Sequence, residues 1–121
     1  MALKFDELKG RVSIIAVAKE LGYELEIEDI AFDSVIPEVT SGKADFGMSV
    51  MTVTEERKQN VNFSDTYATA RQSVIVKENS DISSIDDLTG KIIGVQTGTT
   101  GDIYASDDYG DENIERYNKG M

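Results

Sequence analysis

The spacing of apolar residues predicts a helix and then a strand at the start of the chain. Residues 12–21 place apolar side chains at helical spacing, and Gly22 supplies the left-handed stop that ends many helices. The apolar positions are Ile14, Ile15, Ala18 and Leu21. Apolar residues then alternate with glutamates over residues 23–28, a period of two that is typical of a strand with one solvent-exposed face.

A second helix and strand are predicted over residues 33–50. Asp33 or Ser34 can cap a short helix, whose Pro37 is tolerated only in the first turn. Val35, Ile36 and Val39 can face a core. Ser41 and Gly42 close this helix, and residues 44–50 then have the composition of a buried strand.

The second half of the chain is also predicted to alternate helices with strands. Residues 73–76 and 91–95 are strand candidates, and Ser84 with Asp87 resembles a capping box that opens a one-turn helix ended by Gly90. A glycine- and threonine-rich loop over 96–101 leads to a helix near 102–105, and 114–117 forms a last short strand. Helices that alternate with strands predict the α/β class.

Composition narrows the possible chemistry. The 121 residues carry 23 acids against 12 bases, a net charge of −11, which argues against nucleic acid as a partner. The chain contains neither Cys nor His, so thiol chemistry, disulfides and most zinc or triad sites are excluded. We expect no cofactor, no metal and no catalytic residue. No apolar run approaches the roughly 20 residues of a membrane span, and the first residues lack the apolar core of a signal peptide.

One segment has the residues to hold a carboxylate. The stretch from Ser49 to Arg57 leaves a strand, exposes hydroxyls and backbone amides, and presents an arginine one turn beyond a Thr54 cap. A guanidinium fork pairs with both oxygens of a carboxylate. An arginine beside Glu55 and Glu56 is also typical of a solvated surface ion pair, so both interpretations stay open.

Three other features each have a structural alternative. The loop 97–101 before a helix can bind an anion, but this lone pattern is weak evidence, and a strand-to-helix turn that needs glycines is the simpler explanation. Phe32 can stack on a ligand or cover the edge of a core. The acidic run 107–112 lacks the spacing of a calcium loop, and we interpret it as a solvated turn.

Six collinear segments together resemble the type II solute-binding proteins of polar-amino-acid ABC importers. They are residues 16–23, 32–37, 41–45, 51–57, 63–67 and 88–100. The resemblance implies the type II periplasmic-binding-protein fold in partial form, with most of lobe 1 in residues 1–75 and the crossover and beginning of lobe 2 in residues 76–121. The chain is expected to begin after the family's first strand and to stop inside the second lobe.

The resemblance also implies a ligand site for a free amino acid. Phe32 would stack beside the ligand, Val50 through its backbone and Thr52 through its hydroxyl would hold the main-chain groups, and Arg57 would clamp the carboxylate. Thr100, with Thr99 near it, would add donors from the second lobe.

The implied role is the binding component of an importer, which acts outside the cytoplasm and delivers its amino acid to the permease membrane subunits. Two alternatives differ in class. One is a self-associating fragment, a dimer or swapped oligomer, that has lost affinity. The other is an enzyme like the cyclohexadienyl dehydratases of this fold, although no carboxylate pair stands out to support it. Which amino acid is bound is not determined by these residues.

Overall fold

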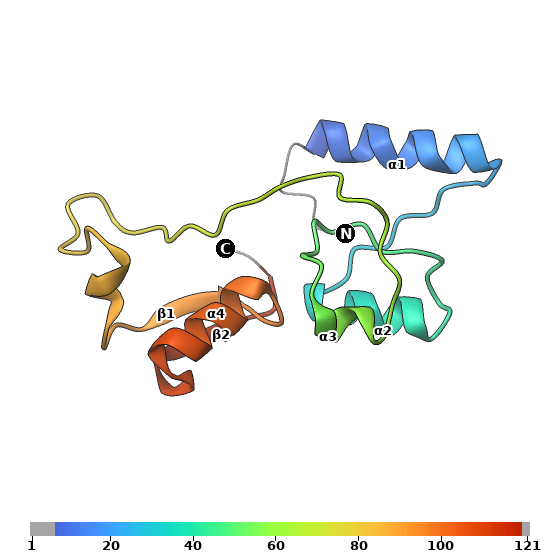
Figure 1. Cartoon of the computed structure of the whole chain (residues 1–121). Coiled ribbons are helices and arrows are strands. Elements are labelled where there is room, and N and C mark those ends of the chain that lie inside the picture. Colours follow the sequence, from blue (N-terminus) through green and yellow to red (C-terminus); the bar gives the residue numbers. More distant parts are fainter. Residues whose placement is uncertain (1–6, 120–121) are drawn as a thin grey trace. The chain divides into compact units, whose positions relative to one another are not determined.

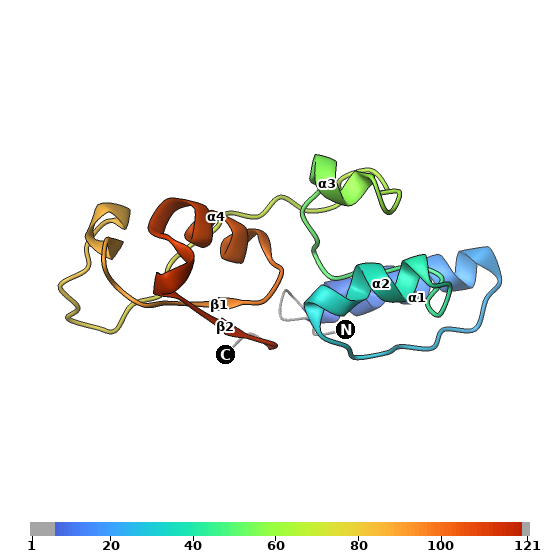
Figure 2. The same ribbon diagram turned by 90° about the horizontal axis from the view of Figure 1, so that it is seen from below.

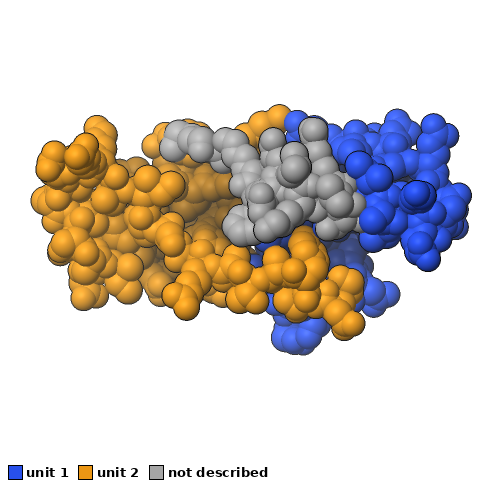
Figure 3. Space-filling model, turned by 90° about the horizontal axis from the view of Figure 1, so that it is seen from above, with its two compact units in different colours: residues 1–63 blue, residues 64–121 orange. Residues whose placement is uncertain are grey.

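The computed structural model describes residues 7–119, and the side chains of residues 14–119. The chain divides into two compact units, residues 1–63 and residues 64–121, which Figure 3 shows in separate colours. Each unit is considered by itself. The predicted lobe boundary after residue 75 stays a prediction.

Unit 1 contains only helices among its regular elements within the described residues. They are α1 (Glu7–Leu21), η1 (Phe32–Ser34), α2 (Val35–Thr40) and α3 (Glu55–Lys58) (Figure 1). The predicted first helix is confirmed and starts earlier than expected. It ends as predicted, because Gly22 follows with a φ of 75° that favours glycine. Its buried face carries Ile14 and Ala18, whereas Ile15 and Val17 are 54% and 46% exposed.

The predicted helix before residue 41 is confirmed as α2. Ser34 is its N-cap residue, although the Ser34 side chain makes no capping hydrogen bond, and Gly42 follows the helix with a φ of 74°. The backbone at Gly47 lies against this helix. A Cβ at Gly47 would lie 2.5 Å from Val35 Cγ1, so any larger residue at this position would require the Val35 side chain or the segment to shift.

Three predicted strands do not form. Residues 23–27, 44–50 and 73–76 have no strand structure. A strand exists only as part of a hydrogen-bonded ladder, and none of these segments has a ladder partner among the described residues. Residues 25–27 and 45–49 make no hydrogen bond in the part of the chain that the structure describes. The sequence patterns of these segments predicted an extended conformation, but a local pattern does not show whether a partner strand is present.

Unit 2 contains the sheet of the described residues. It comprises η2 (Ile85–Leu88), β1 (Ile93–Gln96), α4 (Thr100–Tyr109), η3 (Asp111–Asn113) and β2 (Ile114–Tyr117). The strands pair in parallel, with Ile93 opposite Ile114 and Gln96 opposite Tyr117. Helix α4 connects them and packs on both strands (Figure 2). This is the β-α-β arrangement that parallel pairing requires. The last two predicted strands are therefore confirmed, and the predicted helix is longer than expected.

A buried carboxylate organises the packing of α4 on the sheet. Asp102 is 6% exposed, and its Oδ1 accepts a hydrogen bond from Arg116 Nε of β2 at 2.8 Å. Its Oδ2 accepts from the Gly98 amide at 2.9 Å. Arg116 also pairs with Asp111, and that hydrogen bond is the main cause that raises the pKa of Arg116. One carboxylate thus joins the helix, the loop before it and the second strand.

The capping box at η2 is confirmed. Asp87 Oδ2 accepts from the amides of Ser83 and Ser84, each at 2.9 Å. These bonds stabilise the charged carboxylate, and they lower the pKa of Asp87 to about 2. Within residues 7–119, no helix has the length and apolarity needed to cross a membrane.

Candidate functional site

The predicted arginine lies at the end of a capped helical turn in unit 1. Thr54 is the N-cap of α3, and its Oγ1 accepts from the Arg57 amide at 3.2 Å, as the sequence predicts. The turn is only four residues long, so this cap determines where the arginine is placed. Glu55 and Glu56 occupy the first turn, where the positive end of the helix dipole stabilises negative charge.

Arg57 is buried, and the interpretation of it as a solvated surface arginine is wrong. It is 8% exposed, and its Nη1 donates to the Thr52 carbonyl at 2.8 Å. Its guanidinium carbon lies 5.6 Å from the centroid of the Phe32 ring, within range of a cation–π contact. The structure therefore brings together three residues that the sequence proposed for one site, and Phe32 takes a place beside the cation.

Burial changes the electrostatics of this guanidinium. Desolvation lowers the pKa of Arg57, and the nearby Glu56 carboxylate partly opposes that shift. An arginine stays protonated at neutral pH even so. A buried cation is uncommon in proteins, because removing a charge from water costs free energy that hydrogen bonds and nearby charges must offset. The hydrogen bond to the Thr52 carbonyl orients the planar guanidinium of Arg57. A ligand carboxylate can pair with the guanidinium in that plane.

Val50 has an unusual backbone conformation at the start of this segment. Its φ is 51°, a left-handed value that β-branched residues rarely adopt. Such a conformation costs about 1–3 kcal/mol and persists only where the surroundings impose it. Backbone strain of this kind is concentrated at binding and catalytic sites, so it supports the placement of Val50 at the site. Sequence alone could not reveal it.

The two threonines proposed from unit 2 lie at the start of α4. Thr99 is the N-cap, whose Oγ1 accepts from the Asp102 amide at 3.2 Å and donates to the Gln96 carbonyl at 2.8 Å. Thr100 is 5% exposed, and its Oγ1 accepts from Gln72 Nε2 at 2.9 Å. Their ligand contacts stay predictions. Gln72 was missed by the sequence analysis, because 28 residues separate it from Thr100 and no local pattern links them.

The loop before α4 is a strand-to-helix turn. Gly98 has a φ of 74°, which favours glycine. The loop amides are used within the chain: the Gly98 amide donates to Asp102, and the Thr99 amide donates to the Gln96 carbonyl. The carboxylate of Asp102 thus takes the place that an external anion would occupy in the alternative interpretation.

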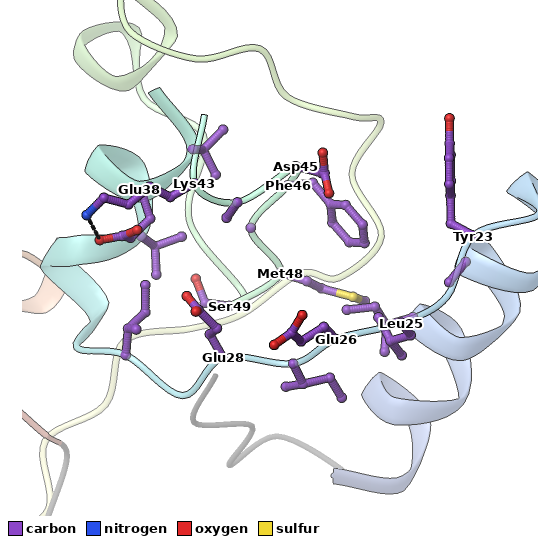
Figure 4. Close-up of a pocket in the computed structure, with 18 of the residues that line it drawn as sticks. Tyr23, Leu25, Glu26, Glu28, Glu38, Lys43, Asp45, Phe46, Met48 and Ser49 are labelled. Atoms are coloured by element: carbon purple, nitrogen blue, oxygen red, sulfur yellow. Dashed lines mark hydrogen bonds and ion pairs between the residues drawn. The ribbon is translucent and has the colours of Figure 1, made fainter. Parts of the chain in front are cut away.

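A separate groove lies within unit 1 and has a volume of about 680 Å³. Figure 4 shows it between two segments, residues 23–28 and residues 44–49, with side chains of α1 and α2 completing its lining. The Ser49 hydroxyl in this lining is buried without a hydrogen-bond partner. The sequence analysis did not foresee this groove, because it expected both segments to be paired strands.

The acidic run 107–112 does not gather into a metal site. Asp107 and Asp108 are exposed on α4, and Asp111 pairs with Arg116. No group of three or more acidic residues within the described range is arranged to hold a metal ion.

Comparison with known proteins places these features in a family. Residues 13–120 match the family described as bacterial extracellular solute-binding proteins, family 3. The arginine-binding extracellular protein ArtP of Bacillus subtilis (strain 168) is 46% identical over 84 residues, which make up 69% of this chain and 33% of that protein. A probable histidine-binding protein of Neisseria gonorrhoeae is 39% identical over 99 residues, which are 81% of this chain and 37% of that protein.

Solved structures show the same likeness. An ancestral arginine-binding protein bound to glutamine superposes with a TM-score of 0.85 at 38% identity, covering 91% of this chain and 49% of that one. The arginine-bound form of truncated ArgBP from T. maritima superposes with a TM-score of 0.84 at 42% identity, covering 91% and 52% of the two chains. The chain spans about a third of the length of the two relatives and about half of these solved chains.

Proposed function

Because the chain belongs to the bacterial extracellular solute-binding proteins, family 3, we propose that it contributes the carboxylate-binding part of a site for a free polar amino acid. The chain has the type II periplasmic-binding-protein fold over about half the length of its solved neighbours. The relatives compared are named as binding proteins for arginine and histidine, and not as enzymes. A binding role is therefore favoured over catalysis.

The observation that carries the proposal is the buried guanidinium of Arg57. Its bond to the Thr52 carbonyl and its position over Phe32 fix its orientation before any ligand arrives. A preorganised cation loses little freedom when it binds, and a bidentate pair with a carboxylate adds geometric selectivity. The ligand's carboxylate pairs with Arg57, and the Phe32 ring lies beside the ligand's apolar atoms.

The remaining predicted contacts complete the proposal. The backbone of Val50 and the hydroxyl of Thr52 hold the main-chain groups of the amino acid, and Thr100, with Thr99 near it, adds donors at the start of α4. In the whole protein, the bound amino acid passes to the membrane subunits of an ABC permease, and binding takes place outside the cytoplasm. The names of the two relatives make arginine and histidine the first ligands to test, and the solved ancestral protein bound to glutamine adds glutamine.

Isothermal titration calorimetry of the 121-residue chain tests the proposal. We expect saturable heat with one of the twenty amino acids, ornithine or cystine, and no detectable binding after Arg57→Ala. Arg57→Lys keeps the charge but loses the planar fork, so we expect affinity to fall by at least about tenfold. Lys58→Ala is the matched control, because Lys58 is an exposed cation on the same turn that pairs with Glu55.

Two results would contradict this proposal. One is ligand binding that Arg57→Ala leaves intact while circular dichroism shows a folded chain. The other is a folded chain that gives no heat with any of these ligands, which would favour the alternative of a self-associating fragment without affinity. Turnover of an arogenate- or prephenate-like substrate would favour the enzymatic alternative.

A further inference from the structure

The side chain of Gln72 lies against the first turn of α4 within unit 2. Its Nε2 donates to the Thr100 hydroxyl at 2.9 Å. Its Oε1 lies near Gly101, since a Cβ at Gly101 would be 3.1 Å from Oε1 and 3.9 Å from Cδ. The first turn of a helix carries partial positive charge, which favours the carbonyl end of an amide there. Both ends of the Gln72 amide thus meet the start of the helix, which determines the orientation of the amide.

The hydrogen bond from Gln72 determines the direction of the Thr100 hydroxyl. A threonine hydroxyl rotates about its Cβ–Oγ1 bond and offers one proton and two acceptor lone pairs. When the hydroxyl accepts from an amide, its own proton must point away from that amide. Thr100 is 5% exposed, so little water competes with Gln72 for this role.

The neighbouring threonine shows why the direction matters. Thr99 Oγ1 accepts from the Asp102 amide at 3.2 Å and donates to the Gln96 carbonyl at 2.8 Å. The single proton of the Thr99 hydroxyl is therefore used within the chain. A hydroxyl that donates to a ligand at this end of α4 is accordingly assigned to Thr100.

We propose that Gln72 is a positioning residue, which directs the Thr100 hydroxyl as a donor toward the carboxylate of a bound amino acid. This inference rests on the proposed function, in which Thr100 adds a donor to the ligand site. A glutamate at residue 72 would have nearly the same shape as glutamine but would reverse the hydrogen bond. Its carboxylate would accept the proton of Thr100, so the hydroxyl would turn a lone pair toward the negative charge of the ligand.

Isothermal titration calorimetry of the 121-residue chain tests this role with L-arginine, L-histidine and L-glutamine as probes. For the probe that binds the native chain most tightly, we expect Gln72→Glu to weaken binding at least about 30-fold at pH 7, because a hydrogen bond is reversed and a like charge is added. Gln72→Leu removes the bond without adding charge, and we expect a loss of about fivefold. Asn118→Asp is the charge-matched control, because Asn118 is an exposed amide residue of the same unit. We expect it to change affinity less than about twofold.

Lowering the pH separates a positioning role from a merely structural one. The carboxyl introduced by Gln72→Glu regains a donor when it is protonated, and an ordinary glutamate has a pKa of about 4.3. The bound carboxylate of the ligand raises that pKa, so the affinity of the variant relative to the native chain should recover as the pH falls from about 6 to about 4. Asp102, the other acid in the first turn of α4, is present in both chains, so its titration cancels in this ratio.

A double-mutant cycle shows whether Gln72 acts through Thr100. Thr100→Val removes the hydroxyl, so adding Gln72→Leu to it should change the affinity less than about twofold. A second measurement needs no ligand. In an NMR titration, the pKa of the carboxyl introduced by Gln72→Glu should rise by about half a unit or more when Thr100→Val is added, because a donor to the charged form is lost.

Two results would overturn the inference and leave the proposed function standing, provided that circular dichroism shows folded variants. One is binding that Arg57→Ala abolishes and Gln72→Glu leaves unchanged, or weakens to the same extent at every pH. The other is an introduced carboxyl whose pKa is the same with and without the Thr100 hydroxyl.

A different pair of results concerns the proposed function itself. Binding that survives Arg57→Ala, but that Gln72→Glu weakens and low pH restores, would contradict the role of Arg57 and support that of Gln72. A folded native chain that binds none of the probes would overturn both.

Discussion

The two units differ in how their backbone amides and carbonyls find hydrogen-bond partners. In unit 2, β1 and β2 pair with each other, and the loop between β1 and α4 bonds to itself and to Asp102. In unit 1, Thr54 caps α3, but the segments that line the groove make no ladder in the described residues. A helix needs only its own turn and its caps, whereas a strand depends on a second segment.

The strength of the apolar pattern does not explain this difference. Residues 44–50 include Phe46, Met48 and Val50, yet they form no strand. Strand β2 has two charged residues among its four, Glu115 and Arg116, and it pairs in full register with β1. Arg116 gains the buried carboxylate of Asp102 as a partner. Pairing thus follows the available neighbour and not hydrophobicity alone.

Hydrogen–deuterium exchange gives the largest expected contrast between the units. We expect the ladder amides of β1 and β2 to exchange at least about 100-fold more slowly than the amides of residues 25–27, which make no hydrogen bond within the described part of the chain. Equal exchange rates in the two sets of amides would show that the comparison is wrong.

Asp102→Ala should produce the next largest effect, confined to unit 2. The substitution leaves Arg116 without its buried partner and the Gly98 amide without its acceptor. Removing one partner of a fully buried pair costs 3–5 kcal/mol, but Arg116 is 36% exposed. We therefore expect the free energy of unfolding of unit 2 to fall by about 2 kcal/mol.

Urea unfolding followed by NMR signals from each unit measures this effect. Asp108→Ala is the control, because Asp108 is an exposed acid on the same helix. We expect the control to change the stability of unit 2 by less than about 0.5 kcal/mol. If both variants unfold at the same urea concentration, Asp102 does not organise the unit.

The smallest expected effect concerns the pH dependence of Asp87. Its folded pKa of about 2 lies below its ordinary value of 3.8, so the folded state binds its proton more weakly than the unfolded state does. Its contribution to stability is present above about pH 4 and is lost as the pH falls toward 2. Asp87→Asn should reduce the loss of stability in that window, and Asp86→Asn should not. An NMR titration midpoint for Asp87 near 4 would contradict the assignment.

The sequence predicted the parts of the fold that depend on nearby residues. Gly22 and Gly42 ended helices where expected, and Thr54 capped the turn that carries Arg57. Residues 114–117 formed the predicted last strand. Each of these features is set within a few residues, through a left-handed glycine, a capping hydroxyl or a period of two.

Long-range partners could not be predicted in the same way. The pairs Gln72 with Thr100 and Asp102 with Arg116 span 28 and 14 residues, and no local spacing links them. The contact of Arg57 with Phe32 could not be predicted from local spacing either. Only the resemblance to a family placed both residues at one site. The groove was missed because a strand pattern does not show whether a neighbour is present.

The contact between Gly47 and α2 makes residue 47 a sensitive position for later substitutions. A Cβ there would lie 2.5 Å from Val35 Cγ1 and 3.7 Å from Val39 Cγ2, so any larger residue requires the valine side chain or the segment to move. A valine in a helix has essentially one preferred χ1 rotamer, which limits how far its side chain can give way. Even the addition of a single methyl group at residue 47 therefore has to be accommodated by a neighbouring element that lies 12 residues earlier in the chain.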